Sequence, residues 1–93
     1  MKVQFFGSIR AAVQKDEQTL AAAMDSSVYD LLWALADRYG GAFQGEIFWP
    51  DEGLRDDVTI LLDGVVADHA RLASLKITEG AIVALLPSFP GGG

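Results

Sequence analysis

One amphipathic helix is the feature that most constrains how this chain folds. Residues 27–30 have the spacing of a capping box, with Ser27 as the N-cap and the side chain of Asp30 reaching back to it. Gly40-Gly41 supplies the C-terminal stop. Because a single apolar stripe has to be buried against another element, we expect this helix to lie on one face of a sheet. The stripe consists of Val28, Leu31, Leu32, Leu35, Ala36 and Tyr39.

Short strand-like segments flank this helix on both sides. Apolar alternation and β-branched residues predict each strand. Asp63-Gly64 predicts a tight hairpin turn, because both residues tolerate positive φ. The last segment is apolar on both faces, which indicates a central position in the sheet. The predicted strands are residues 2–6, 18–24, 58–62, 65–67 and 81–86.

The order of these elements predicts an α+β fold, with a mixed sheet of about five strands and one main helix on one face. A first hairpin, a crossover helix and a last strand beside the first form a β-grasp arrangement, one of several topologies that this order allows. Residues 10–16 are predicted as a loop or short helical turn, residues 42–57 as a loop with at most one helical turn, and residues 72–75 as a single helical turn. Trp33 falls off the apolar stripe and is expected to pack under residues 42–57.

Composition excludes several kinds of chemistry. The chain has no cysteine, which excludes a disulfide, a thiolate metal site and a cysteine nucleophile. Its single histidine, His69, excludes a multi-histidine metal site within one chain, and no nucleophile is spaced to form a triad with Asp68 and His69. The acidic residues at positions 51, 52, 56 and 57 match no EF-hand spacing and are expected to form a solvated loop. No metal site is predicted.

Length and charge limit the class of protein and its partners. The 93 residues argue for one domain, here a β-grasp domain at residues 1–87 followed by a flexible tail at residues 88–93. The net charge of −6, with seven scattered basic residues, makes nucleic acid a poor partner. No apolar run approaches the roughly 20 residues needed to cross a bilayer, and the N-terminus does not resemble a signal peptide. A cytoplasmic protein without a membrane partner is therefore expected.

The C-terminal segment has two interpretations. Its prolines discourage helix and sheet pairing and its glycines carry no side chains, so it should project from the fold as a flexible arm. Terminal glycines usually belong to a frayed end. A terminal glycine carboxylate can also enter a narrow tunnel that would reject a β-carbon, and there be adenylated by ATP without any base or nucleophile on the chain itself. The segment is Pro87-Ser88-Phe89-Pro90-Gly91-Gly92-Gly93.

Four segments in order carry a family resemblance. They are VQFFGSIR at residues 3–10, SVYDLL at 27–32, VTILLDG at 58–64 and EGAIVALLP at 79–87. They resemble the first strand, the helix start, the hairpin strand and the last strand of the molybdopterin synthase small subunit, a member of the MoaD/ThiS family of ubiquitin-like sulfur carriers. The family pattern often has Asn-Gly where this chain has Asp63-Gly64, and it ends in a terminal di-glycine.

The resemblance implies a ubiquitin-like β-grasp fold whose function lies in the tail. Gly93 would be adenylated by a ubiquitin-activating-type enzyme and converted to a thiocarboxylate, with Gly91 and Gly92 as the preceding tail glycines. ATP would be used by that enzyme, and no cofactor would be bound to this chain. The implied acceptor is the large subunit of molybdopterin synthase, with another sulfur acceptor as the alternative, and the product would be molybdopterin or a related tungsten cofactor. The chain would then be the sulfur-donating subunit of a complex rather than a catalyst on its own.

Two other functions stay open on the sequence. One is a ubiquitin-like modifier joined through Gly93 to lysines of target proteins. The other is a plain interaction domain with an inert tail. The tail also departs from the family pattern, since three glycines extend it by one residue, or up to about 3.3–3.6 Å of reach. This extra residue leaves open which partner is used and whether Gly93 is trimmed first.

Strand alternation predicts a second functional surface. If Val3 and Phe5 face the helix, then Phe6 lies on the opposite, open face of the sheet. Leu61 joins Phe6 there when its neighbours in the strand point inward. An apolar open face is a docking surface for the activating enzyme or the synthase. Phe89, in the tail, is a third candidate for partner binding. The alternative is that Phe48 or Trp49 covers this face.

Overall fold

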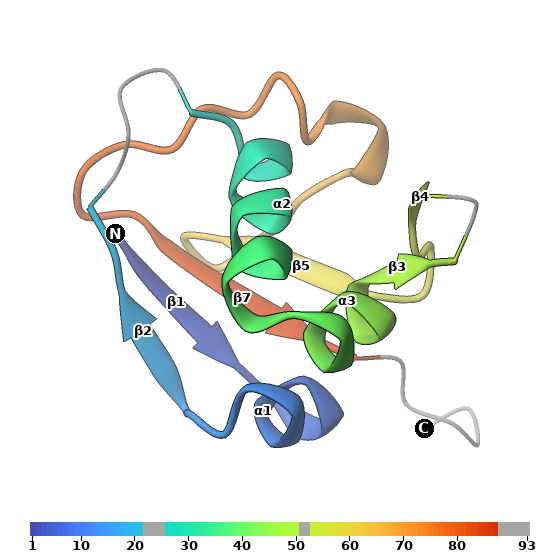
Figure 1. Ribbon diagram of the computed structural model, residues 1–93. Helices are drawn as coiled ribbons and strands as arrows, with labels where there is room; N and C mark the ends of the chain where they lie inside the picture. The colour runs from blue at the N-terminus through green and yellow to red at the C-terminus, as the bar shows by residue number, and fades with distance from the viewer. Residues whose placement is uncertain (22–25, 51–52, 88–93) are drawn as a thin grey trace.

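A five-stranded mixed sheet with helices on one side forms the body of the protein (Figure 1). The computed structural model describes residues 1–21, 26–50 and 53–87. In chain order the elements are β1 (Lys2–Phe5), α1 (Gly7–Val13), β2 (Glu17–Thr19), α2 (Val28–Tyr39), α3 (Gly41–Ile47), β3 (Phe48–Trp49), β4 (Gly53–Leu54), β5 (Thr59–Leu62), β6 (Val65–Val66), a 3₁₀ helix (His69–Arg71) and β7 (Ile82–Leu86).

The sheet has the strand order β2-β1-β7-β5-β6, and β3 pairs separately with β4. The first and last strands run parallel at the centre, with Val3 opposite Val83. All other pairs are antiparallel. Parallel strands need a long crossover, and the segment containing α2 supplies it. This is the predicted β-grasp arrangement, and the predicted central position of the last strand is confirmed.

The capping box predicted for α2 is present. Ser27 Oγ accepts a hydrogen bond from the backbone N–H of Asp30 at 3.1 Å, and Asp30 Oδ2 accepts one from the backbone N–H of Ser27 at 3.2 Å. These two bonds satisfy donors that the first helical turn otherwise leaves unpaired. The helix ends at Tyr39, and Gly40 follows it as the predicted stop, with a φ of 80° that turns the chain away.

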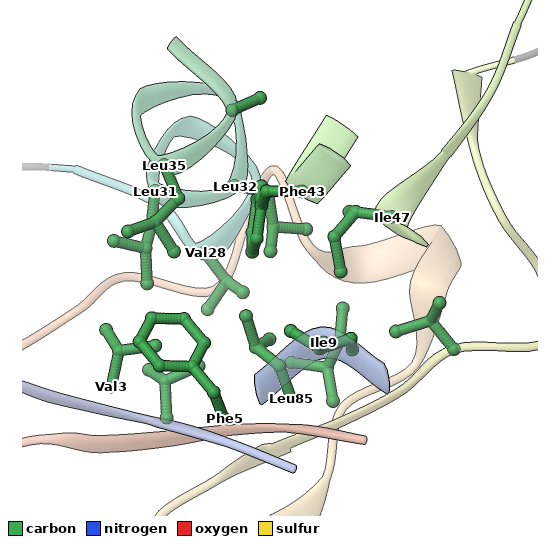
Figure 2. Close-up of a cluster of buried hydrophobic side chains, with 14 of the residues drawn as sticks. Val3, Phe5, Ile9, Val28, Leu31, Leu32, Leu35, Phe43, Ile47 and Leu85 are labelled. Carbon is green, nitrogen blue, oxygen red and sulfur yellow. The ribbon is translucent and has the colours of Figure 1, made fainter. Parts of the chain in front are cut away.

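The core lies between the sheet and the helices (Figure 2). Val3 and Phe5 of β1 point toward α2, so the predicted inward face of β1 is confirmed. The ring of Phe5 meets the ring of Phe43 from α3 edge to face, with the centroids 6.3 Å apart. Five of the six predicted stripe residues are buried, and Tyr39 packs against the core at its edge. The five are Val28, Leu31, Leu32, Leu35 and Ala36.

Two helices were not predicted. The segment expected to be a loop or short turn at residues 10–16 instead belongs largely to α1, which begins at Gly7 and ends at Val13. The segment expected to be a loop with at most one helical turn at residues 42–57 contains most of the seven-residue helix α3 and the short strands β3 and β4. Neither helix has a side-chain N-cap, and glycine disfavours helix, so the local signals are weak. Burial of residues four apart, such as Phe43 and Ile47, overrides that local preference.

The remaining differences concern element boundaries. The predicted second strand at residues 18–24 forms as β2 over Glu17–Thr19, and residues 22–25 lie outside the described part of the chain. The helical turn predicted at residues 72–75 is present, since the N–H of Leu75 donates to the carbonyl of Arg71 at 3.1 Å, and it directly follows the 3₁₀ helix His69–Arg71. The hairpin turn is confirmed, because Asp63 and Gly64 have φ values of 50° and 83°. Such a turn demands positive φ at both positions.

Removing the capping side chain should weaken α2. We expect Ser27→Ala to lower the free energy of unfolding by about 1 kcal/mol, because the N–H of Asp30 loses its acceptor. The control is Ser74→Ala, since the exposed Ser74 hydroxyl donates only to the carbonyl of Arg71 and should change stability by less than about 0.5 kcal/mol. Urea denaturation measures both variants. Equal effects would contradict the role assigned to the capping box.

The neighbouring phenylalanines of the first strand should differ sharply in their contribution to stability. Phe5 is 2% exposed in the core, whereas Phe6 is 42% exposed on the other side. We expect Phe5→Ala to cost about 3–5 kcal/mol, because it leaves a cavity. Phe6→Ala should cost about 1 kcal/mol or less, because it removes a half-exposed ring. The same denaturation experiment compares them, and a larger loss for Phe6→Ala would overturn the assignment of faces.

Candidate functional site

The candidate site has two parts, the C-terminal tail and the open face of the sheet. The tail residues Phe89, Gly91, Gly92 and Gly93 lie outside the described residues, so their roles stay predictions. The described chain ends with Pro87, a buried residue that directly follows β7. The tail therefore begins where the central strand of the sheet ends.

A row of side chains crosses the face of the sheet that lies opposite α2. Gln4 pairs with Ala84, Ala84 with Leu61, and Leu61 with Val66. Side chains alternate between the two faces of a sheet along each strand. Since Val3, Val83 and Ile60 are buried on the helix side, the residues of this row point to the opposite face. Leu61 is thus placed near the middle of the helix-free face.

A second row lies at the end of the sheet where β1 and β7 end. The backbone N–H of Phe6 donates to the carbonyl of Leu85 at 3.2 Å, which continues the β1–β7 ladder by one residue. Phe6 itself is extended, with φ −127° and ψ 156°, so its ring points to the face opposite that of Phe5. Leu86 lies beside it on β7, and Thr59 pairs with Leu86. Phe6 and Leu61 therefore share one face, and their role in partner binding stays a prediction.

The apolar residues of the two rows, with Ile82, form a surface that we call the open sheet face. Figure 1 shows α2 and α3 on the other side of the sheet. Three members are exposed large hydrophobic residues: Phe6 at 42%, Val66 at 67% and Ile82 at 42%. Leu61 and Leu86 are partly exposed, and Ala84 is buried. Apolar side chains gathered on one open face favour an interaction site. The open sheet face consists of Phe6, Leu61, Val66, Ile82, Ala84 and Leu86.

Sequence reasoning identified Phe6 and Leu61 but did not name Val66, Ile82 or Leu86. Alternation alone shows which residues of one strand share a face, and it does not show which strands are neighbours. The register between β5, β6 and β7 supplies that information. The hairpin signal at Asp63-Gly64 would have been enough to pair Leu61 with Val66, since a two-residue turn determines the register of its strands.

Phe48 and Trp49 do not cover the open sheet face. The Phe48 ring stacks on the Trp33 ring of α2, with the centroids 4.2 Å apart and the planes 22° apart, and Phe48 belongs to the core. The Trp49 ring lies beside α3 with the Arg55 guanidinium 4.2 Å above it. Both rings are therefore on the helix side of the molecule. The predicted packing of Trp33 against residues 42–57 is confirmed.

The acidic loop is partly neutralised by an arginine that sequence reasoning overlooked. Arg55 donates two hydrogen bonds to the Asp57 carboxylate, at 3.0 and 2.8 Å, and a third to the carbonyl of Gly45 at 3.1 Å. The hydrogen bonds from Arg55 hold the pKa of Asp57 below its usual value, and those to Asp57 raise the pKa of Arg55. Asp56 is exposed, whereas Asp51 and Glu52 lie outside the described residues. The ion pair thus lies within this loop, and the hydrogen bond from Arg55 to Gly45 joins the loop to α3.

The other polar candidates have structural roles. Asp68 Oδ1 accepts from the backbone N–H of Ala70 at 3.0 Å and so caps the 3₁₀ helix. Among residues 1–21, 26–50 and 53–87, no three or more His, Cys, Asp or Glu side chains are grouped to hold a metal ion. Within the same ranges, no helix combines the length and apolar character needed to span a membrane.

Comparison with solved structures shows the same fold in several small proteins. Small archaeal modifier protein 1 from Haloferax volcanii superposes with a TM-score of 0.84 at 24% identity, covering 98% of this chain and 97% of that one. The same modifier from Methanosarcina acetivorans gives 0.78 at 25% identity, covering 98% and 94%. A putative molybdopterin converting factor subunit 1 from Pyrococcus furiosus gives 0.72 at 23% identity, covering 95% of each chain.

Comparison of the sequence supplies the family. No curated protein matches the chain. The model of the ThiS family matches residues 3–92, which include almost the whole chain and two of the three terminal glycines. Together with the β-grasp sheet, this match shows that the chain belongs to the ThiS family of ubiquitin-like sulfur carriers.

Proposed function

We propose that this chain carries sulfur as a thiocarboxylate on Gly93 and donates it in the biosynthesis of molybdopterin or a related tungsten cofactor. The observation that supports this most is the family match, because it continues through the tail as far as Gly92. A match confined to the folded body would have supported the fold alone. The likeness to the putative molybdopterin converting factor subunit from Pyrococcus furiosus is in keeping with this choice of pathway.

The proposed chemistry needs no side chain from the carrier. A carboxylate oxygen of Gly93 attacks the α-phosphorus of ATP, and pyrophosphate leaves. Hydrosulfide then attacks the acyl carbon, AMP leaves with the former carboxylate oxygen, and loss of the S–H proton gives the thiocarboxylate. The activating enzyme supplies ATP and the catalytic groups, in the cytoplasm where ATP is abundant. Absence of cysteine agrees with this division, since the carrier itself has no thiol nucleophile.

The geometry of the body suits delivery of the tail to a partner. Leu86 is the last residue of the open sheet face, and Pro87 follows it directly. An enzyme seated on this face therefore lies beside the start of the tail. The six residues 88–93 span at most about 22 Å when fully extended, so the adenylation site has to lie within that distance of Pro87. The net charge of −6 favours a basic partner surface.

A second function is favoured by one specific observation. The small archaeal modifier protein 1 structures superpose with TM-scores of 0.84 and 0.78. A protein modifier would use the same acyl adenylate, but a lysine amine rather than sulfur would finally take up the acyl group. The two functions therefore share the tail and differ in the nucleophile.

Intact mass analysis of the protein made in its native host tests the proposal. We expect a fraction of the molecules to carry sulfur in place of one oxygen at the C-terminus, and the fraction to disappear when Gly93 is deleted if Gly93 is the loaded residue. Sulfur on a chain ending at Gly92 would show that the third glycine is trimmed. Lysine conjugates without thiocarboxylate would favour the modifier. Free carboxylate alone, without conjugates, would contradict both functions.

Docking through the open sheet face predicts different effects for two adjacent valines. Val66 and Val65 are 67% and 69% exposed, but Val66 shares the face of Leu61 whereas Val65 pairs with Leu62 and points to the other face. We expect Val66→Asp to raise the KM of the activating enzyme for the carrier by about tenfold, because it places a charge in an apolar interface. Val65→Asp is the matched control and should change KM by less than about twofold. Pyrophosphate exchange measures both, and equal effects would argue against this docking face.

A further inference from the structure

Gly7 and Pro87 meet where the central strand ends. A β-carbon built on Gly7 would lie 2.7 Å from Cγ of Pro87 and 3.3 Å from Cδ. Carbon atoms in good contact are about 3.5–4.0 Å apart, so the ring and a side chain at position 7 exclude one another. Six other glycines are described, at positions 40, 41, 45, 53, 64 and 80, and a β-carbon on any of them would meet nothing within 4 Å. The close approach is thus specific to Gly7 within the described chain.

Both partners of this contact are held in place. The backbone of Phe6 donates to the carbonyl of Leu85, and the carbonyl of Phe6 accepts from the N–H groups of Ile9 and Arg10 at 3.1 and 3.2 Å. Gly7, with a φ of 54°, directly follows Phe6 and is the first residue of α1. The ring of Pro87 closes on its own backbone nitrogen, so it cannot move aside without moving the chain. Pro87 is buried, although the tail begins at the next residue.

We propose that Gly7 is a positioning residue for the tail: its bare α-carbon seats the ring of Pro87 and so determines the point from which residues 88–93 leave the fold. The consequence for chemistry rests on the proposed function. For an enzyme bound to the open sheet face, the tail then starts at one fixed position relative to that face. A displacement of about 1 Å far from the reacting atoms can lower a rate by as much as 10²-fold, because the reacting group no longer reaches its productive geometry.

The test begins with Gly7→Ala and two matched glycine controls. Gly64 and Gly80 also have positive φ, 83° and 85°, but open space around them. Alanine at these positions therefore carries the backbone strain without the collision. In NMR spectra of the wild-type protein, a nuclear Overhauser effect is expected between the α-protons of Gly7 and the ring protons of Pro87. We expect Gly7→Ala to shift the Pro87 ring resonances, whereas Gly64→Ala and Gly80→Ala leave them in place.

The kinetic arm uses pyrophosphate exchange by the activating enzyme of the native host. We expect Gly7→Ala to lower kcat about tenfold with KM within about twofold, because the docking face is intact and the reach of the tail is altered. Both glycine controls should keep the wild-type kcat. A general loss of folding would lower the amount of active carrier in all three variants, which thermal denaturation measures.

A double-mutant cycle distinguishes the loss of the contact between Gly7 and the Pro87 ring from any other effect of Gly7→Ala. Pro87→Ala removes the ring atoms that collide, so Gly7→Ala should have little further effect on kcat when residue 87 is alanine. An equal, additive loss in both backgrounds would overturn the proposal, and so would wild-type kcat for Gly7→Ala. If the wild-type chain is not adenylated at all, the proposed function fails instead. The Overhauser effect then decides whether Gly7 seats Pro87, and its absence would overturn the contact itself.

Discussion

The parallel pairing of β1 with β7 is the constraint on which the rest of the structure depends. It joins the first and last strands of the described chain at the centre of the sheet, with Val3 opposite Val83 and Phe5 opposite Leu85. A parallel pair cannot be closed by a tight turn, so the intervening chain has to cross over the sheet, and α2 covers one face as it does so. The other face is left open. The same pairing ends at Phe6 and Leu85, which brings Gly7 next to Pro87 and places the start of the tail beside the open sheet face.

Sequence reasoning succeeded where the determining interactions are local. The capping box of Ser27 and Asp30 involves residues three apart, and the turn at Asp63-Gly64 depends on the backbone freedom of two neighbours. It failed for α1 and α3, because their helical state is stabilised mainly by burial. Phe43 is completely buried, although α3 contains Gly41 and Gly45 and lacks a side-chain cap. Tertiary packing of this kind overrides propensity and leaves little trace in a short segment.

The same distinction applies to the candidate site. Alternation in β1 and β5 was enough to place Phe6 and Leu61 on one face, but the full surface required the order of the strands. The ion pair of Arg55 with Asp57 lies within a short sequence distance, yet its role becomes visible only when Arg55 also reaches Gly45 of α3. The contact between Gly7 and Pro87 joins the two ends of the described chain, and no local pattern at either residue signals it.

A seated Pro87 gives the length of the tail a physical meaning. If the exit point moved freely, one additional glycine would matter little, because the body could shift relative to the partner to compensate. In the proposed arrangement, Gly7 fixes the position of Pro87 and the partner binds the open sheet face. The number of residues after Pro87 then determines how far the terminal carboxylate extends. One extra residue then changes that reach by up to about 3.3–3.6 Å, which is larger than the tolerance of a reacting group. The family match ends at Gly92, whereas this chain has a third glycine at position 93. The additional glycine therefore has two interpretations. On the proposed function, the partner's channel would be deeper by one residue, or Gly93 would be removed before the carrier is loaded.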